Sequence, residues 1–130
     1  MSLDAHLSEI KSEFDTALSL EIGRWSAWPD ALREASAYAL MSGGKRFRPV
    51  LSLLTADALR ITRAEVMPWA LAVELVHTYS LVHDDLPAMD DDDLRRGKPT
   101  VHRAFGEAMA ILVGDALLTR AFGILADVKQ

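Results

Sequence analysis

Acidic and basic side chains concentrate in one short stretch of this sequence, between residues 84 and 98. Six of its first ten residues are aspartates, namely Asp84, Asp85, Asp90, Asp91, Asp92 and Asp93. Three cationic residues follow at once, namely Arg95, Arg96 and Lys98. Carboxylates this close repel one another, and a bound cation relieves the repulsion. Because the donors are oxygens and the chain has no cysteine, the stretch suits a hard ion such as Mg²⁺, whose shell is completed by water and substrate phosphates.

The arginines indicate what such a metal would hold. Guanidinium groups match phosphate oxygens in pairs, so acidic and basic groups in one loop predict a metal-bridged polyphosphate. A solvated surface loop is the alternative for any run of aspartates. Here, however, the run closes an unusually apolar helix. An EF-hand is excluded, since no Asp-x-Asp-x-Asp-Gly frame fits between Asp84 and Gly97.

A second cationic cluster lies upstream, in the segment Gly43-Gly44-Lys45-Arg46-Phe47-Arg48-Pro49. Its two glycines let the backbone approach an anion closely, and its arginines supply paired donors. The alternative is that these cations only favour the dipole at the C-terminus of the preceding helix. A histidine could join the cluster, because His77 lies two helical turns before Asp84 on the same face.

These two segments, together with His83 and the residues up to Thr100, resemble the trans-isoprenyl diphosphate synthase family, and most of all the bacterial farnesyl diphosphate synthases. The pattern Asp84-Asp85-x-x-x-x-Asp90 followed by two arginines is similar to the first aspartate-rich motif of that family. The likeness runs nearly end to end, but the family's second aspartate-rich motif is absent. We therefore expect residues 1–130 to form the N-terminal half of one synthase domain, and to be inactive alone.

The resemblance implies a role for each matching residue. It assigns Mg²⁺ to Asp84 and Asp90, and the allylic diphosphate, dimethylallyl or geranyl, to Arg95. It assigns isopentenyl diphosphate to four residues, namely Lys45, Arg48, His77 and Arg96. It leaves the role of Arg46 open and names no side chain as acid or base, because in the family the departing diphosphate can take the proton. His83 and His102 are expected to be hydrogen-bonded structural residues.

The residues one turn before Asp84 bear on the product. A prenyl tail running back along the helix meets Ser80 and then Tyr79 after about 6 to 7.5 Å of rise. Ser80 is too small to stop the tail, whereas Tyr79 resembles the aromatic floor of farnesyl-type cavities. We therefore expect farnesyl diphosphate as the product, with geranylgeranyl or geranyl diphosphate synthesis as the alternative.

The elements that must position these residues are predicted to be helices. Apolar residues recur at helical spacing, first at Leu3, Leu7, Ile10, Phe14 and Leu18. The same reasoning predicts helices ending near Gly23, from about Pro29 to Met41, from Pro49 through Leu59, from about Ala64 to Asp84 or Asp85, and from Val101 through Leu125 with an interruption near Gly106. No strand alternation appears. The fold class is therefore all-α, with five or six helices, and the resemblance implies a helical bundle of the isoprenoid synthase type.

A single proline decides whether the two metal-binding aspartates can meet. In an unbroken helix Asp84 and Asp90 would lie about 9 Å apart along the axis and roughly 240° apart around it. Pro87 cannot donate to the carbonyl of His83, and its ring clashes there, so it breaks the helix. We expect irregular backbone over residues 86–89 that brings Asp90 back towards Asp84.

Composition limits the class of protein. The chain is one domain by length, half hydrophobic and a quarter charged, and its net charge of −5 argues against nucleic acid as a partner. The start of the sequence lacks the pattern of an export signal, and no run of eighteen uncharged apolar residues suggests a membrane span. With no cysteine, a cytoplasmic location fits. The helices over 69–82 and 108–125 are apolar on most faces, so we expect self-association, as the homodimer typical of the family.

Two further hypotheses compete with a prenyltransferase. A terpene cyclase shares the aspartate-rich helix but needs no site for isopentenyl diphosphate, so segment 43–49 counts against it. A non-catalytic helical partner protein would use its acidic loop to bind metal or a basic surface. Binding of Mg²⁺ and isopentenyl diphosphate, measured separately, distinguishes the three.

Overall fold

The computed structural model describes residues 2–129, most of which are helical. The helices are α1 (Leu3–Gly23), α2 (Asp30–Met41), α3 (Phe47–Leu59), α4 (Arg63–Asp84), α5 (Val101–Phe105) and α6 (Glu107–Ala126). A short antiparallel hairpin, β1 (Leu94–Arg95) and β2 (Lys98–Pro99), follows α4. The all-α prediction and the number of helices are confirmed. The hairpin was not predicted, because strands of two residues have no alternation to detect.

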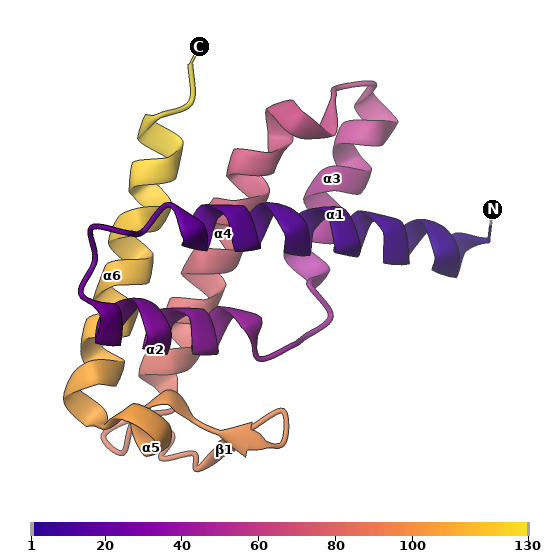
Figure 1. Ribbon diagram of the computed structural model, residues 1–130. Helices are drawn as coiled ribbons and strands as arrows, with labels where there is room; N and C mark the ends of the chain where they lie inside the picture. Colours follow the sequence, from indigo (N-terminus) through magenta and orange to yellow (C-terminus); the bar gives the residue numbers. More distant parts are fainter. Residues whose placement is uncertain (1, 130) are drawn as a thin grey trace.

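The helices form two crossing layers (Figure 1). Helices α1 and α2 run antiparallel across one side, and α3, α4 and α6 lie behind them in directions close to perpendicular. Within the second layer α4 is central and packs against both α6 and α3. The hairpin and α5 lie at one end of this layer, where α4 stops.

The core lies between the two layers. Its fully buried apolar side chains come from five helices and include Ile10, Phe14, Leu18, Leu40, Leu53, Leu75, Val113 and Leu117. The apolar stripe predicted for the first helix supplies three of these side chains, whereas its first residue, Leu3, is exposed. Burial of one such side chain stabilises the fold by about 1.5 to 3 kcal/mol.

Local signals explain where the helices begin. The Thr62 amide donates to the Glu65 carboxylate at 3.1 Å, which satisfies an N–H at the start of α4. Helix α3 begins at Phe47, two residues before the predicted start at Pro49. Proline is tolerated there because the first N–H groups of a helix have no partner within it. The residue before α3, Arg46, has a left-handed backbone with φ of 52°.

Several apolar side chains stay exposed on the outer faces. On α4 these are Trp69, Val73 and Val76, and on α6 they are Ile111, Leu112 and Phe122. By length and composition alone α6 could cross a membrane, but the core helix of a soluble protein has the same length and composition. Of the most apolar stretch of α6, 33% is buried. Helix α6 packs on α4, α5 and α2, as a core helix does. The exposed faces agree with the expected self-association, which itself stays a prediction.

Candidate functional site

The acidic loop, residues 85–93, folds back on the end of α4. The backbone is irregular across residues 86–89, as predicted from Pro87. The Asp90 amide donates to the carbonyl oxygen of Asp84 at 2.8 Å, and the Asp92 amide donates to that of Asp85 at 3.1 Å. The break therefore returns Asp90 to Asp84, although an intact helix would have separated them.

An ion pair between a buried carboxylate and a half-buried guanidinium ties this loop to the hairpin. Asp85 is only 3% exposed, and Arg95 donates to both of its carboxylate oxygens, at 2.8 Å from Nε and 2.6 Å from Nη2. The hydrogen bonds from Arg95 to Asp85 raise the pKa of the guanidinium above its usual value. Strand β1 is thereby clamped to the end of α4. Sequence reasoning did not single out Asp85 for this role.

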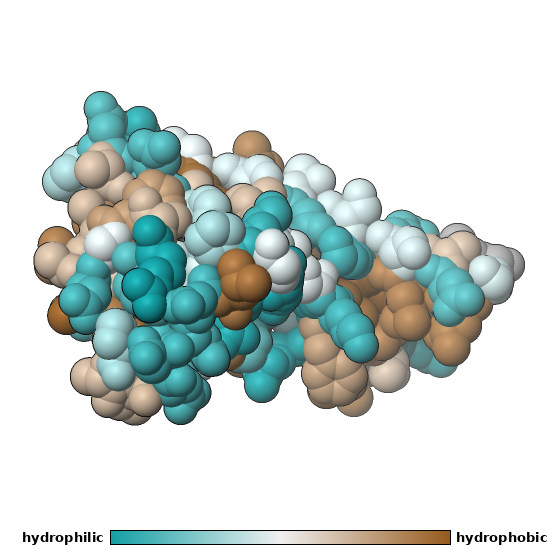
Figure 2. Space-filling view, turned by 90° about the horizontal axis from the view of Figure 1, so that it is seen from below, coloured by the Kyte–Doolittle hydropathy of each residue, from teal (hydrophilic) through white to brown (hydrophobic). Residues whose placement is uncertain are grey.

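The remaining aspartates of the loop face solvent. Figure 2 views the molecule from this end and shows hydrophilic side chains gathered over it. Within residues 2–129, three groups have ligand atoms within 4.8 Å of one another, namely Asp91, Asp93 and His102. The sequence did not indicate this set, because His102 belongs to α5 and reaches the loop only in the folded chain.

The donor chemistry at this end fits a hard divalent cation. Asp90 is exposed and Asp84 half-buried, and their donors are carboxylate oxygens. The two backbones lie side by side. Two carboxylates with water and phosphate oxygens are the usual ligand set of Mg²⁺, so this pair could hold the metal, and their role stays a prediction.

The second half of the site is an open cavity of about 510 Å³ beside the start of α3. Its lining includes Lys45, Arg48, His77 and Arg96. These are the four residues that the resemblance assigned to isopentenyl diphosphate. They come from three separate parts of the chain, namely residues 45–48 at the start of α3, helix α4 and the hairpin, so only the fold brings them together.

The adjacent arginines of the hairpin point to different places. Arg95 turns to Asp85, whereas Arg96 donates to the carbonyl oxygen of Gly43 and lines the cation-rich cavity. Gly44 makes room for it, because a Cβ there would lie 2.7 Å from Arg96 Cζ. The two adjacent arginines therefore serve different parts of the site, while the substrate assigned to each arginine stays a prediction.

His77 is half-buried on the wall of this cavity. Burial lowers its pKa below the ordinary value of 6.5, and the positive charges of Arg48, Arg96 and Arg95 lower it further, although the Glu74 carboxylate acts in the opposite direction. The imidazole is therefore neutral at pH 7. A neutral ring next to cations can donate one hydrogen bond to an anion and take up a proton when the anion arrives.

The residues proposed to set product length lie on the same helix. The Tyr79 ring meets the ring of His83 edge-on, with 5.6 Å between centroids. The Nε2 atom of His83 lies 3.0 Å from the carbonyl oxygen of Ile111 and occupies a notch at Gly114, where a Cβ would come within 2.0 Å of it. Tyr79 is thus held on the side of α4 that faces α6. Ser80 donates to the carbonyl oxygen of His77 at 2.7 Å.

Both remaining histidines of interest are hydrogen-bonded within the fold, as expected, although His102 also belongs to the group with Asp91 and Asp93. His83 is hydrogen-bonded to α6, and His102 is buried with Nδ1 at 3.2 Å from the Thr100 hydroxyl. Thr100 also donates to the carbonyl oxygen of Asp92 at 2.9 Å. The start of α5 is thereby joined to the acidic loop.

Comparisons with known proteins agree with this geometry. The family model described as polyprenyl synthetase matches residues 29–130. Farnesyl diphosphate synthase of Geobacillus stearothermophilus is 54% identical over the whole chain, which spans 43% of that protein. The large subunit 1 of a heterodimeric geranylgeranyl pyrophosphate synthase of Arabidopsis thaliana is 55% identical over 76% of the chain and 27% of its own length.

A solved structure shows the same fold. The geranyltransferase of Legionella pneumophila superposes with a TM-score of 0.93 at 42% identity, over 96% of this chain and 44% of that one. The chain therefore spans less than half the length of the relatives it matches.

Proposed function

Because the chain belongs to the polyprenyl synthetase family, we propose that it supplies part of a Mg²⁺-dependent prenyltransferase that joins isopentenyl diphosphate to an allylic diphosphate, dimethylallyl or geranyl. The observation that carries the proposal is the cavity lined by Lys45, Arg48, His77 and Arg96. A terpene cyclase has no use for such a cavity, and a solvated acidic loop does not explain it.

The cavity suits the diphosphate of isopentenyl diphosphate. Lys45 and Arg48 are exposed at its edge, and Arg96 reaches it from the hairpin. Arginine presents paired donors to phosphate oxygens, and lysine adds a mobile positive charge. His77 donates from its neutral ring or, once protonated, adds a charge of its own. These side chains hold and orient the substrate, and none of them acts as the base of the reaction.

The acidic loop would hold the allylic diphosphate through metal. Asp84 and Asp90 would bind Mg²⁺, which when bound supplies Lewis-acid stabilisation of the charge that develops on the departing diphosphate. Arg95 pairs with Asp85, the residue next to Asp84, and we assign it to the same diphosphate. The proton lost at the end of the reaction would pass to the departing diphosphate.

Product length is proposed to be set by Tyr79. Its ring is packed on His83 and stands five residues before Asp84, so a tail running back along α4 would meet it after about 7.5 Å of rise. Geranylgeranyl diphosphate is the second candidate, because the Arabidopsis relative carries that name. Replacing Tyr79 with alanine in a full-length enzyme should release longer products, and products that still end at fifteen carbons would place the floor elsewhere.

The working enzyme is proposed to be a cytoplasmic homodimer. The exposed apolar side chains on α4 and α6 support a partner surface. Turnover is expected only from a chain that also carries the family's second aspartate-rich motif. Turnover of both substrates by the purified 130-residue chain would contradict that expectation.

Calorimetry tests the proposal directly. Isopentenyl diphosphate titrated into this chain without Mg²⁺ should bind, because its site consists of side chains alone. Binding of dimethylallyl diphosphate should require Mg²⁺. Metal-dependent binding of the allylic substrate alone would favour a cyclase, and binding of neither substrate would favour a non-catalytic protein.

A further inference from the structure

Of the three cationic residues at the start of α3, Arg46 differs from the other two in its burial. Lys45 and Arg48 are exposed, whereas Arg46 is 5% exposed. The backbone of Arg46 is left-handed, with φ of 52°, a conformation that costs a residue with a side chain about 1 to 2 kcal/mol. Such strain persists only where surrounding contacts impose it. The contacts of Arg46 therefore need an explanation of their own.

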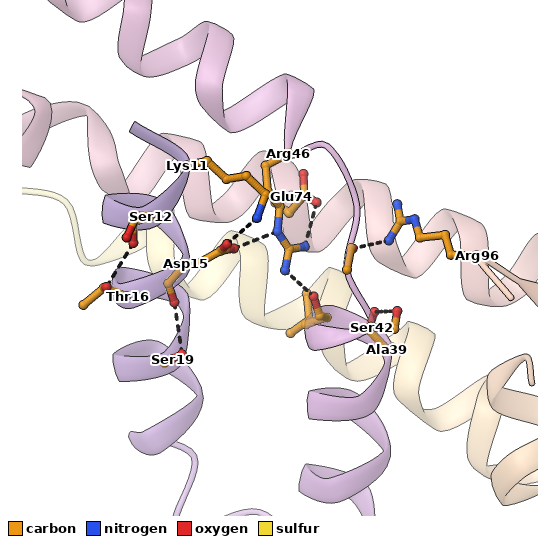
Figure 3. A network of polar contacts seen from close by, with 12 residues as sticks. Lys11, Ser12, Asp15, Thr16, Ser19, Ala39, Ser42, Arg46, Glu74 and Arg96 are labelled. Carbon is orange, nitrogen blue, oxygen red and sulfur yellow. Dashed lines mark hydrogen bonds and ion pairs between the residues drawn. The ribbon is translucent and has the colours of Figure 1, made fainter. Parts of the chain in front are cut away.

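Arg46 ties three helices together (Figure 3). Its Nε donates to Asp15 of α1 at 2.9 Å, one terminal nitrogen donates to Glu74 of α4 at 3.2 Å, and the other donates to the Leu40 carbonyl of α2 at 2.7 Å. The guanidinium also lies over the ring of Phe14, 5.9 Å from its centroid. Each of the three guanidinium nitrogens thus donates to an acceptor, an arrangement that the single ammonium group of lysine could not reproduce.

The charges of this network balance within the protein. Lys11 donates to Asp15 at 2.7 Å, so two cations face the carboxylates of Asp15 and Glu74. Partial burial of Asp15 would raise its pKa, but the hydrogen bonds from Lys11 and Arg46 hold that pKa below its usual value. Arg46 and Glu74 also border the cavity, but the charge of Arg46 is already matched by these carboxylates and the residue is only 5% exposed.

We infer that Arg46 is a positioning residue for the diphosphate cavity. Its inward fork fixes the left-handed turn, and this turn directs the two flanking cations, Lys45 and Arg48, outward. The same loop supplies the Gly43 carbonyl that receives Arg96. Displacing the loop would therefore disturb three of the four residues assigned to isopentenyl diphosphate, namely Lys45, Arg48 and Arg96. The ligand of the cavity is taken from the proposed function, whereas the contacts of Arg46 do not depend on that proposal.

The test compares the wild-type chain with Arg46→Lys, which keeps the charge and loses the fork. Two quantities are measured, the Kd of isopentenyl diphosphate without Mg²⁺ by calorimetry and the amide NMR signals of residues 43–45. We expect Arg46→Lys to weaken binding at least tenfold and to shift these signals. An unchanged Kd together with unchanged signals would overturn the inference.

The matched control is Arg63→Lys. Arg63 also joins three helices, through Asp57 of α3 at 2.7 Å and Glu13 of α1 at 2.8 Å, but it begins α4 fourteen residues before His77. This variant should leave both quantities unchanged. An equal loss of binding in Arg63→Lys would show a general effect of stability and would equally overturn the inference.

A second variant covers the case in which Arg46→Lys does not fold. Asp15 is a partner of Arg46 and lies outside the cavity, and Asp15→Asn keeps its shape while removing its charge. The variant should therefore weaken binding of isopentenyl diphosphate about threefold, through its effect on Arg46. Unchanged binding and loop signals in a folded Asp15→Asn chain would count against the inference. If the wild-type chain binds no isopentenyl diphosphate, the proposed function fails, and the loop signals alone decide the role of Arg46.

Discussion

The two loops that build the site are held in opposite ways. The loop before α3 is anchored from within, because the buried Arg46 side chain connects it to three helices. The acidic loop after α4 is held by backbone hydrogen bonds and by the Asp85–Arg95 pair, while its other aspartates face solvent. One loop is thus preorganised by the protein, and the other presents a cluster of exposed carboxylates, of which Asp93 pairs with Arg103.

This difference indicates a division of labour. A site for an anion can be completed by side-chain cations alone, so the loop before α3 needs no further component. A site made of neighbouring carboxylates is relieved of repulsion only when positive charge arrives. We therefore expect the cation-rich cavity to bind diphosphate in the absence of metal, and the acidic loop to depend on Mg²⁺.

The largest expected effect is on the clamp of the acidic loop. Asp85→Ala leaves the Arg95 guanidinium without its partner and should lower the free energy of unfolding by about 2 to 4 kcal/mol. Asp93→Ala is the matched control, because its pair with Arg103 is largely exposed and should contribute about 0 to 1 kcal/mol. Urea unfolding measures both. Equal losses would mean that the loop is not held through Asp85.

The notch under His83 should give the next largest effect. Gly114→Ala places a Cβ 2.0 Å from His83 Nε2 and should cost about 1 to 3 kcal/mol by overpacking. Gly123→Ala on the same helix meets only the flexible end of Arg120 at 3.4 Å, so it should be neutral or stabilise by up to about 1 kcal/mol. Thermal unfolding compares the two. A Gly114→Ala chain as stable as the Gly123→Ala chain would contradict the tight packing of His83 against α6.

Metal-free binding of pyrophosphate tests the division between the loops. Arg48→Ala should raise the Kd of pyrophosphate about tenfold, a loss of about 1.4 kcal/mol in binding free energy. Arg33→Ala removes an arginine that pairs with Asp30 on the surface of α2, and it should change the Kd little. Asp90→Ala should also leave metal-free binding intact. Loss of this binding in Asp90→Ala would contradict the proposed independence of the two loops.

The smallest expected effect is on the protonation of His77. Its pKa in the free chain should lie below 6.5, because burial and neighbouring arginines disfavour the charged ring. Pyrophosphate adds negative charge and should raise that pKa, so binding takes up a proton and strengthens as the pH falls. Proton NMR, with the signal assigned by its loss in His77→Gln, measures the pKa with and without ligand.

The same shift has a consequence for stability. Because the pKa of His77 is lower in the folded chain, the unfolded chain binds the proton first as the pH falls below about 6.5. The contribution of His77 therefore destabilises the fold in acid and vanishes above that pH. A His77→Gln chain should lose less stability than the wild type between pH 7 and 5.5. An identical pH dependence would argue against a depressed pKa.

Much of this fold could be predicted from local pattern. Helix periodicity, the glycines after α2, Thr62 before α4 and the break at Pro87 all act within a few residues, where backbone sterics and hydrogen bonding decide the outcome. The motif residues were found for the same reason, since their spacing is readable along the chain. Their grouping in one cavity was inferred only from the resemblance, because the elements that carry them are far apart in sequence.

The tertiary structure decided which charges face inward. Arg46 and Arg48 are two positions apart and look alike in the sequence, yet the first is buried among the side chains of three helices and the second is exposed. Asp84 and Asp85 are likewise adjacent in the sequence, yet Asp84 is half-buried and Asp85 is buried. Asp85 can be buried because Arg95 of the hairpin pairs with it. The direction of a side chain depends on which distant groups can satisfy it once desolvated, and that depends on packing between helices.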